Sequence, residues 1–284
     1  MRWQGRRQSQ NIEDRRGMRV GRGLVGGGIG TVAIVLLAMY FGIDPSVVLQ
    51  GVGTSTVQST NDEPYVESPN EAEWRQQIAV ALAETEDHWN AVFTDLGGSY
   101  REPTLVLFNG AVESGCGFAE AAVGPFYCPA DERVFIDLGF FDQLDAELGA
   151  GGDFARAYVV AHEVGHHVQN LLGASGRVHE LQLRVDQVEA NQLGVRLELQ
   201  ADCYAGLWAH RADKYAGILE AGDAEEALSA ASAVGDDRIQ KSAGRAVVPD
   251  SFTHGSSEQR MRWFRRGFES GSVEGCDTFK AADL

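Results

Sequence analysis

An uncharged stretch near the N-terminus restricts most strongly how this 284-residue chain can fold. From Gly23 to Ile43 the sequence reads GLVGGGIGTVAIVLLAMYFGI, without a charged side chain. About 20 apolar residues in a helix cross the hydrocarbon core of a bilayer. The stretch therefore predicts a single transmembrane helix at residues 23–43, preceded by a basic segment at residues 1–22.

The charges that flank this stretch predict its orientation. Residues 1–23 carry a charge balance of +5, whereas the rest of the chain carries −22. Basic residues favour the cytoplasmic side, so we expect a cytoplasmic N-terminus and an extracytoplasmic domain in the cell membrane. A cleaved signal peptide is an alternative, but the basic leader is long and no clear A-x-A site follows. A buried glycine-rich helix is another, but an arginine cluster flanks it.

The acidic remainder of the chain argues against nucleic acid or anionic lipid as the main partner. Residues 44–70 are polar and short of large apolar side chains, which predicts a linker. The folded domain is then expected at residues 71–284. A basic, aromatic helix is expected near its end, with the arginines on a solvated face.

Residues 71–284 mix helical and strand patterns, which predicts an α+β domain of helices packed on a small sheet. Asp153 is expected to cap the helix that follows it, and Gly194 is expected to break a longer one. The expected strands cover residues 104–108 and 133–138, and the expected main helices cover residues 71–93, 154–172, 178–215 and 223–233.

Four cysteines follow the predicted span, which would place them in an oxidising compartment. They allow three pairings. We favour Cys116–Cys128, within a glycine-rich loop, and Cys203–Cys276, which would tie the tail to a helix. If the topology were reversed, four reduced thiols would be expected instead.

The sequence AHEVGHHV at residues 161–168 gathers three of the seven histidines. His162 and His166 are four residues apart, so on a helix their rings share one face, one turn apart. Imidazole is a good zinc ligand, and H-E-x-x-H is a metalloprotease pattern in which Glu163 can reach a metal-bound water. Surface histidines are the alternative, but the helix is apolar, and buried histidines need partners.

A catalytic zinc site needs a third protein ligand besides these two histidines. A third histidine at the H-E-x-x-H-x-x-G-x-x-H spacing is absent, because Gln169 and Leu172 occupy the required positions. Glu198 in LELQADCYAG is the best candidate, and Asp202 shares its helix face. We expect Glu198 to bind zinc and Asp202 to accept a hydrogen bond from the far nitrogen of either histidine. A solvated face with two acids is the alternative.

Other residues near these are weaker candidates. Cys203 lies about 140° around the helix from Glu198, and His167 points about 100° away from His166. We expect His167 to support the site or to lie on the surface. The remaining histidines without a supporting pattern are expected to be structural or exposed: His88, His179 and His210.

These features together resemble a family of bacterial membrane-anchored neutral zinc metallopeptidases of the gluzincin type. The resemblance covers nearly the whole chain, including CGFAEAAVGPFYCPADERVFIDLGFF, AYVVAHEVGHHVQNLLG, RLELQADCYAGLWAH and FTHGSSEQRMRWF. It implies a compact gluzincin-like domain in which the strand Val134–Leu138 offers an edge to substrate backbone. It also implies the same site residues, with Glu163 as catalytic base, Asp202 as support and three zinc ligands: His162, His166 and Glu198.

A looser resemblance concerns Thr253 and His254, followed by Arg260. Another membrane gluzincin family has a T-H-P…R segment here, and Gly255 replaces its proline in this chain. In that family the histidine and arginine line the active-site cleft. The resemblance implies that His254 donates a hydrogen bond to the oxyanion of the reaction. A loop histidine without a catalytic role is the alternative.

The function predicted from these residues is that of a membrane-anchored, Zn²⁺-dependent endopeptidase acting on polypeptides. Zinc lowers the pKa of water, and Glu163 takes the water proton as general base. A non-catalytic zinc-binding envelope protein or assembly factor is the alternative, although such a site needs no base beside its ligands. A membrane scaffold with incidental zinc is a third possibility.

Overall fold

The computed structural model describes residues 1–18 and 65–284. The predicted transmembrane helix at residues 23–43, and all but the end of the predicted linker, lie outside the described residues. No helix within the described ranges is long and apolar enough to cross a membrane. Residues 1–16 and 67–284 form one compact unit, which contains every helix and strand of the described chain.

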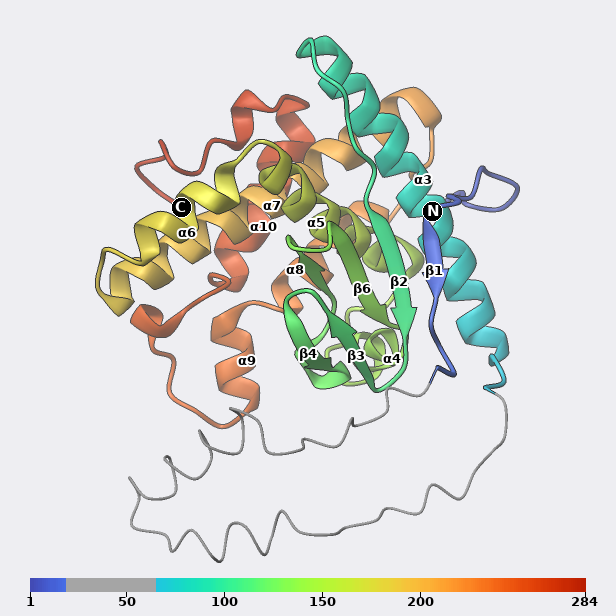
Figure 1. The fold of residues 1–284 in the computed structure, drawn as a ribbon, viewed down its shortest axis with the longest axis horizontal. Coiled ribbons are helices and arrows are strands. Elements are labelled where there is room, and N and C mark those ends of the chain that lie inside the picture. Colours follow the sequence, from blue (N-terminus) through green and yellow to red (C-terminus); the bar gives the residue numbers. More distant parts are fainter. Residues whose placement is uncertain (19–64) are drawn as a thin grey trace, which may run out of the picture. The chain divides into compact units, whose positions relative to one another are not determined.

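This unit combines a small sheet with a larger layer of helices, which confirms the expected α+β class (Figure 1). The strands are β1 (Ile12–Asp14), β2 (Thr104–Phe108), β3 (Ala111–Ser114), β4 (Gly117–Glu120), β5 (Phe126–Cys128) and β6 (Arg133–Asp137). The helices are α3 (Pro69–Asp95), α4 (Gly139–Ala146), α5 (Asp153–Leu171), α6 (Ala174–Gln182), α7 (Gln187–Ala216), α8 (Asp223–Ala233), α9 (Asp236–Ser242) and α10 (Ser257–Ser270).

The main sheet has the strand order β1-β2-β6-β5, and β3 and β4 form a separate hairpin. Strand β6 is paired on both sides, parallel to β2 and antiparallel to β5. The prediction that Val134–Leu138 forms an edge strand is therefore wrong. The edge strand beside β6 is β5, which has only three residues, between Pro125 and Pro129, and is too short for an alternating pattern to reveal.

The N-terminal segment is part of this unit. Ile12 on β1 pairs with Leu105 on β2, and the Met1 ammonium lies 2.7 Å from a carboxylate oxygen of Asp153 and 3.2 Å from one of Asp223. The sequence predicts that residues 1–22 are separate from the folded domain, whereas residues 1–16 pack as part of it. The prediction that Asp153 caps α5 is wrong. Gly152 holds the N-cap position, and the Asp153 carboxylate binds the Met1 ammonium instead.

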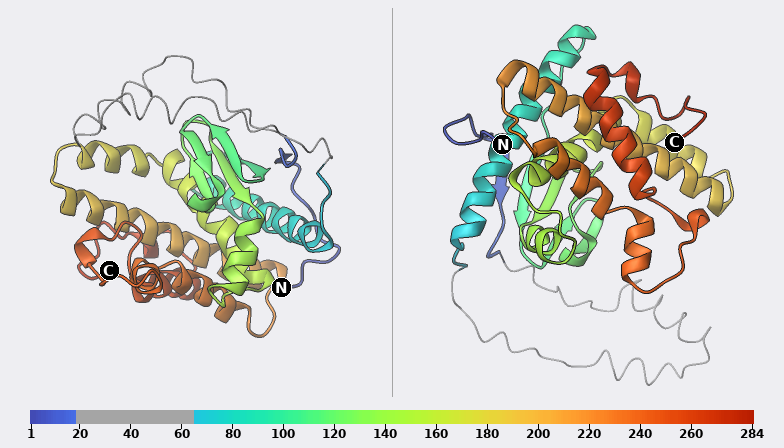
Figure 2. Two further views of the ribbon diagram at one scale, coloured as in Figure 1. Left: turned by 90° about the horizontal axis from the view of Figure 1, so that it is seen from below. Right: turned by 180° about the vertical axis from the view of Figure 1, so that it is seen from behind.

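Helix α7 is continuous through Gly194, so the predicted break is wrong; the chain turns at residues 183–186, between α6 and α7. Helices α7 and α10 pack closely because glycine lies on both sides of their contact. A side chain at Gly206 would overlap the carbonyl of Phe264, and one at Gly267 would overlap that of Cys203. Figure 2 shows α10 on the side of the helical layer that faces away from the sheet.

Both predicted disulfides are confirmed. Cys116–Cys128 joins the turn of the β3–β4 hairpin to the end of β5. Cys203–Cys276 joins α7 to the C-terminal tail. One bridge therefore fastens β5 to the β3–β4 hairpin, and the other fastens the C-terminal tail to α7.

Candidate metal centre

The two helices that carry the predicted ligands meet at a glycine. Gly165 on α5 faces Ala201 on α7, and a Cβ at Gly165 would lie 3.1 Å from the Ala201 Cα. That separation is tighter than ordinary side-chain packing, so any larger residue would push the helices apart. The small residue inside the H-E-x-x-H pattern therefore lets α5 and α7 approach closely enough for their polar side chains to meet.

His162, His166 and Glu198 converge at this crossing. His162 Nε2 lies 3.2 Å from His166 Nε2 and 3.3 Å from a carboxylate oxygen of Glu198. The other carboxylate oxygen of Glu198 lies 3.5 Å from His166 Nε2. A tetrahedral zinc with bonds of about 2.0–2.1 Å separates its ligand atoms by about 3.3–3.4 Å. The three side chains thus fit a zinc ion.

The tautomers of both histidines also favour a cation. Asp202 accepts a hydrogen bond from Nδ1 of His162 at 2.8 Å, and Gln169 accepts one from Nδ1 of His166 at 2.9 Å. Both Nε2 lone pairs then face each other and the Glu198 carboxylate. These electron-rich groups repel one another unless a cation lies between them. Burial lowers the pKa of His162, but Asp202 and Glu198 outweigh it and raise that pKa to about 9.

The carboxylate of Asp202 is fully buried and completely hydrogen-bonded. Besides His162, it accepts hydrogen bonds from Tyr158 at 2.6 Å and from Arg260 at 2.8 and 3.0 Å, one to each of its oxygens. Burial raises the pKa of Asp202, but Arg260 and His162 outweigh it and lower the pKa below its usual value. An ionised Asp202 can therefore hold the His162 ring in one orientation.

Glu163 lines a cleft beside the three converging side chains. Its carboxylate forms no hydrogen bond with any residue of the described chain, whereas Asp202 accepts several. Burial raises the pKa of Glu163 above its ordinary value. A raised pKa suits a carboxylate that must take up a proton and later release it.

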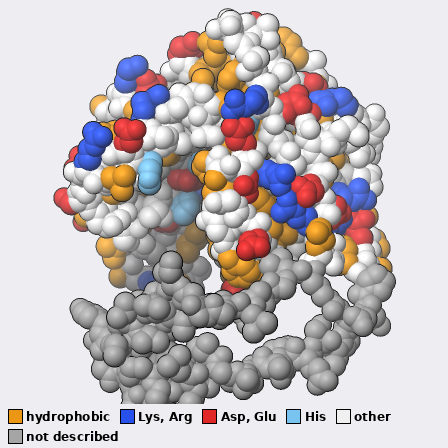
Figure 3. All heavy atoms as spheres, in the orientation of Figure 1, with side chains coloured by type: hydrophobic (Ala, Val, Ile, Leu, Met, Phe, Trp, Pro, Cys, Tyr) orange, Lys and Arg blue, Asp and Glu red, His pale blue; other side chains and the backbone are white. Residues whose placement is uncertain are grey.

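The cleft has a volume of about 580 Å³ and opens on the face shown in Figure 3, where histidine and acidic side chains lie at the bottom of a hollow. Its walls come from the loop before β5, from β5 itself, and from α4, α5, α7 and α9. Most of the wall is apolar, including Val123, Phe140, Leu148, Leu197 and Ile239.

His254 also lines the cleft, on the loop before α10. Asp236, the first residue of α9, holds that loop by accepting hydrogen bonds from the backbone of Thr253 at 2.8 Å, of His254 at 2.6 Å and of Gly255 at 3.0 Å. Its other oxygen lies 3.5 Å from His254 Nδ1. Asp236 thereby raises the pKa of His254 and leaves its Nε2 available.

His167 is neither a ligand nor a surface residue; it is fully buried and fastens the edge strand to α5. Its Nε2 donates to the Arg101 carbonyl at 2.6 Å, so its Nδ1 accepts from the Tyr127 hydroxyl at 3.0 Å. Asn170 donates to the same hydroxyl at 3.1 Å. Because Tyr127 lies on β5, the third histidine of AHEVGHHV positions the strand that borders the cleft.

Reasoning from the sequence missed several supporting residues. Tyr158 precedes His162 by one helical turn and shares its face, so its position could have been found from spacing. The sequence predicts that the arginines of α10 lie on a solvated face, yet Arg260 is buried against Asp202. Gln169 and Asp236 act through contacts between distant segments, which no local pattern reveals.

The fold and the site define an α+β protein whose H-E-x-x-H helix and second, glutamate-bearing helix build a two-histidine, one-carboxylate centre beside a free glutamate. Residues 1–279 match the family described as "Putative neutral zinc metallopeptidase". The chain therefore belongs to this family of neutral zinc metallopeptidases.

Two relatives span nearly the same length as the chain. It is 50% identical over 288 residues to "Uncharacterized protein YpfJ" of Escherichia coli (strain K12), covering 98% of this chain and 99% of that protein. It is 42% identical over 262 residues to "Uncharacterized protein Rv2575" of Mycobacterium tuberculosis (strain ATCC 25618 / H37Rv), covering 87% and 86% respectively. No solved structure matches the chain significantly.

Proposed function

We propose that the protein is a zinc-dependent endopeptidase in which His162, His166 and Glu198 hold the metal and Glu163 is the general base. The observation that carries this proposal is the convergence of three ligand atoms at zinc-like separations beside an unpaired carboxylate in an open cleft. A zinc site with a purely structural role has no use for that carboxylate or for an open cleft.

Zinc bound at this centre would supply Lewis-acid chemistry, lowering the pKa of water and polarising a peptide carbonyl. Glu163 takes the proton of the attacking water and delivers it to the leaving amine. His254 donates a hydrogen bond from Nε2 to the carbonyl oxygen as negative charge develops there. Asp202, held by Arg260 and Tyr158, keeps the His162 ring in its orientation throughout.

The cleft supports an extended peptide as substrate. Strand β5 pairs only with β6 among the described strands, so its other edge can pair with peptide backbone. Apart from Glu163, Glu198, Arg260 and the three histidines, no residue that lines the cleft carries a charge. Nothing there is built to bind a chain terminus, which favours endopeptidase activity on segments with apolar side chains.

Two disulfides favour an oxidising compartment, and we propose an extracytoplasmic location for the domain on that ground. We also propose that residues 23–43, which lie outside the described ranges, attach the protein to a membrane without separating residues 1–16 from the domain, because β1 pairs with β2.

The proposed activity is tested by measuring the metal content of the purified chain by mass spectrometry, together with its cleavage of unfolded casein. We expect one zinc per chain, cleavage inside the casein sequence, loss of cleavage with chelator and recovery with added zinc. Stoichiometric zinc without cleavage of casein or of a broad peptide panel would favour a non-catalytic zinc protein. A chain without zinc would contradict the metal site itself.

A further inference from the structure

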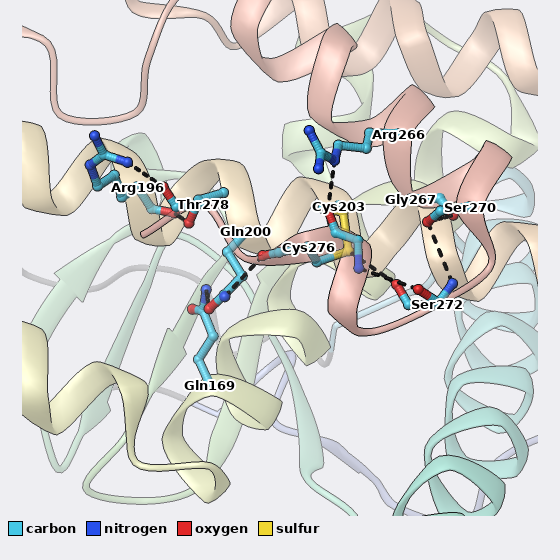
Figure 4. The surroundings of a disulfide bond; sticks show 11 residues. Gln169, Arg196, Gln200, Cys203, Arg266, Gly267, Ser270, Ser272, Cys276 and Thr278 are labelled. Carbon is cyan, nitrogen blue, oxygen red and sulfur yellow. Dashed lines mark hydrogen bonds between the residues drawn. A yellow bond between two sulfur atoms is a disulfide. The ribbon is translucent and has the colours of Figure 1, made fainter. Parts of the chain in front are cut away.

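A series of buried amide groups connects His166 to the C-terminal tail. Gln169 Oε1 lies 2.9 Å from His166 Nδ1, and Gln169 Nε2 lies 2.7 Å from the Leu197 carbonyl and 3.2 Å from Gln200 Oε1. Gln200 Nε2 then lies 3.0 Å from the Cys276 carbonyl. Figure 4 shows Gln169, Gln200 and Cys276 in this succession beside the Cys203–Cys276 disulfide.

Two backbone carbonyls fix the direction of every hydrogen bond in this series. The Cys276 carbonyl can only accept, so Gln200 must donate its Nε2 to it and turn its Oε1 toward Gln169. The Leu197 carbonyl can also only accept, so Gln169 must present Nε2 there and Oε1 to His166. His166 must therefore donate from Nδ1, which leaves Nε2 as the metal-binding nitrogen.

Burial makes the series hard to replace by water. The side chain of Gln169 is fully buried and that of Gln200 is 8% exposed. Buried amides without partners are costly, so each group depends on the next one to keep its orientation.

The last acceptor in the series belongs to a segment that the disulfide holds against α7. Cys276 is bonded to Cys203 by the disulfide. Two residues after Cys276, the Thr278 hydroxyl donates to the Arg196 carbonyl at 2.7 Å, and the Arg196 guanidinium donates to the Thr278 carbonyl. Arg266 also donates to the Gly275 carbonyl at 2.7 Å, and no residue beyond Thr278 is fully buried, so these bonds set the place of the Cys276 carbonyl.

We propose that Gln169 and Gln200 are positioning residues for His166, and that the Cys203–Cys276 disulfide supports metal affinity by holding the carbonyl on which their orientation depends. The inference rests on the metal site proposed above, but not on peptidase activity. It gives the two disulfides different roles, because Cys116–Cys128 fastens β5, whose Tyr127 bonds to the side chain of His167 and not to that of His166.

Zinc affinity tests this proposal, measured on the full-length oxidised chain by competition with a chelator of known affinity. Gln169→Met and Gln200→Met, which keep the disulfide, should each bind zinc roughly 10- to 100-fold more weakly than the wild type. Gln169→Glu loses the donor to the Leu197 carbonyl and to Gln200 but still offers an oxygen to His166 Nδ1, so its zinc affinity should fall less than that of Gln169→Met. If the substitutions acted only by disturbing the packing, Gln169→Glu and Gln169→Met would lower zinc affinity to a similar extent.

The paired cysteine variants provide the matched comparison. Cys203→Ser/Cys276→Ser should weaken zinc binding, whereas Cys116→Ser/Cys128→Ser should leave it unchanged. If the first pair fails to fold, the glutamine variants decide, since their disulfides are intact. Wild-type zinc affinity in Gln169→Met and Gln200→Met would overturn the proposal. Absence of zinc binding by the wild type would instead overturn the metal site on which it depends.

Discussion

His162 Nε2 lies 3.3 Å from a carboxylate oxygen of Glu198, although the two residues belong to different helices, α5 and α7. The contact exists because Gly165 and Ala201 let these helices approach closely. Replacing Glu198 by Gln keeps the shape but removes the negative charge from the proposed ligand. We expect zinc affinity to fall by more than the roughly 10- to 100-fold typical of supporting residues. Wild-type zinc content after dialysis of the variant would contradict this ligand assignment.

Replacement of Asp202 by Asn should weaken both zinc binding and folding. The substitution leaves the buried Arg260 guanidinium without its carboxylate, and the one amide oxygen that remains must serve the donors of both Arg260 and His162. Breaking a buried ion pair on one side typically costs about 3–5 kcal/mol of unfolding free energy. Urea unfolding of the metal-free chain measures that loss, and zinc competition measures the fall in affinity. Glu258→Gln, at an exposed ion pair on α10, is the control and should change neither.

The pair formed by Asp236 and His254 predicts a pH effect on activity. His254 Nδ1 lies 2.9 Å from the Thr253 hydroxyl and 3.5 Å from Asp236. When Nδ1 donates to these oxygens, His254 can donate from Nε2 only as the imidazolium, so activity should fall as pH rises through the pKa of His254. Asp236 raises that pKa, and Asp236→Asn should therefore move the alkaline limb of kcat/KM to lower pH. His254→Gln should remove the limb. An unshifted limb in Asp236→Asn would show that this histidine does not act as the proposed donor.

The position of β1 makes a prediction about membrane topology. Because β1 pairs with β2, residues 1–16 and the domain must lie on the same side of any membrane, whereas a single span at residues 23–43 would separate them. We expect cysteines introduced at the exposed positions Gln8 and Glu180 to respond alike to a membrane-impermeant maleimide on intact cells. Opposite responses would show a single crossing and would be incompatible with the β1–β2 pairing.

Local patterns were sufficient to predict the core of the candidate site. The positions of His162, Glu163 and His166 follow from helical spacing, as does the shared face of Glu198 and Asp202. The crossing of α5 and α7 then places these groups together. The spacing left open which histidine bonds to Asp202, and the structure shows that it is His162.

Features that depend on pairing between distant segments could not be predicted in this way. The sequence of β6 reads as a buried strand, but its place between β2 and β5 depends on neighbours that pattern alone does not identify. The arginines of residues 1–16 resemble a cytoplasmic flank, yet several bind carboxylates of the domain, as Arg7 does with Glu86. The net charge of a segment does not show which of its arginines form ion pairs with carboxylates elsewhere in the chain.

The most direct measurement is the comparison of Glu163→Gln with the wild type for zinc content and for cleavage of unfolded casein. The substitution keeps the size of the side chain and leaves the three proposed ligands in place. We expect stoichiometric zinc in both proteins and a loss of at least about 100-fold in cleavage rate, consistent with the removal of a general base. Wild-type cleavage by zinc-loaded Glu163→Gln would contradict the proposed mechanism.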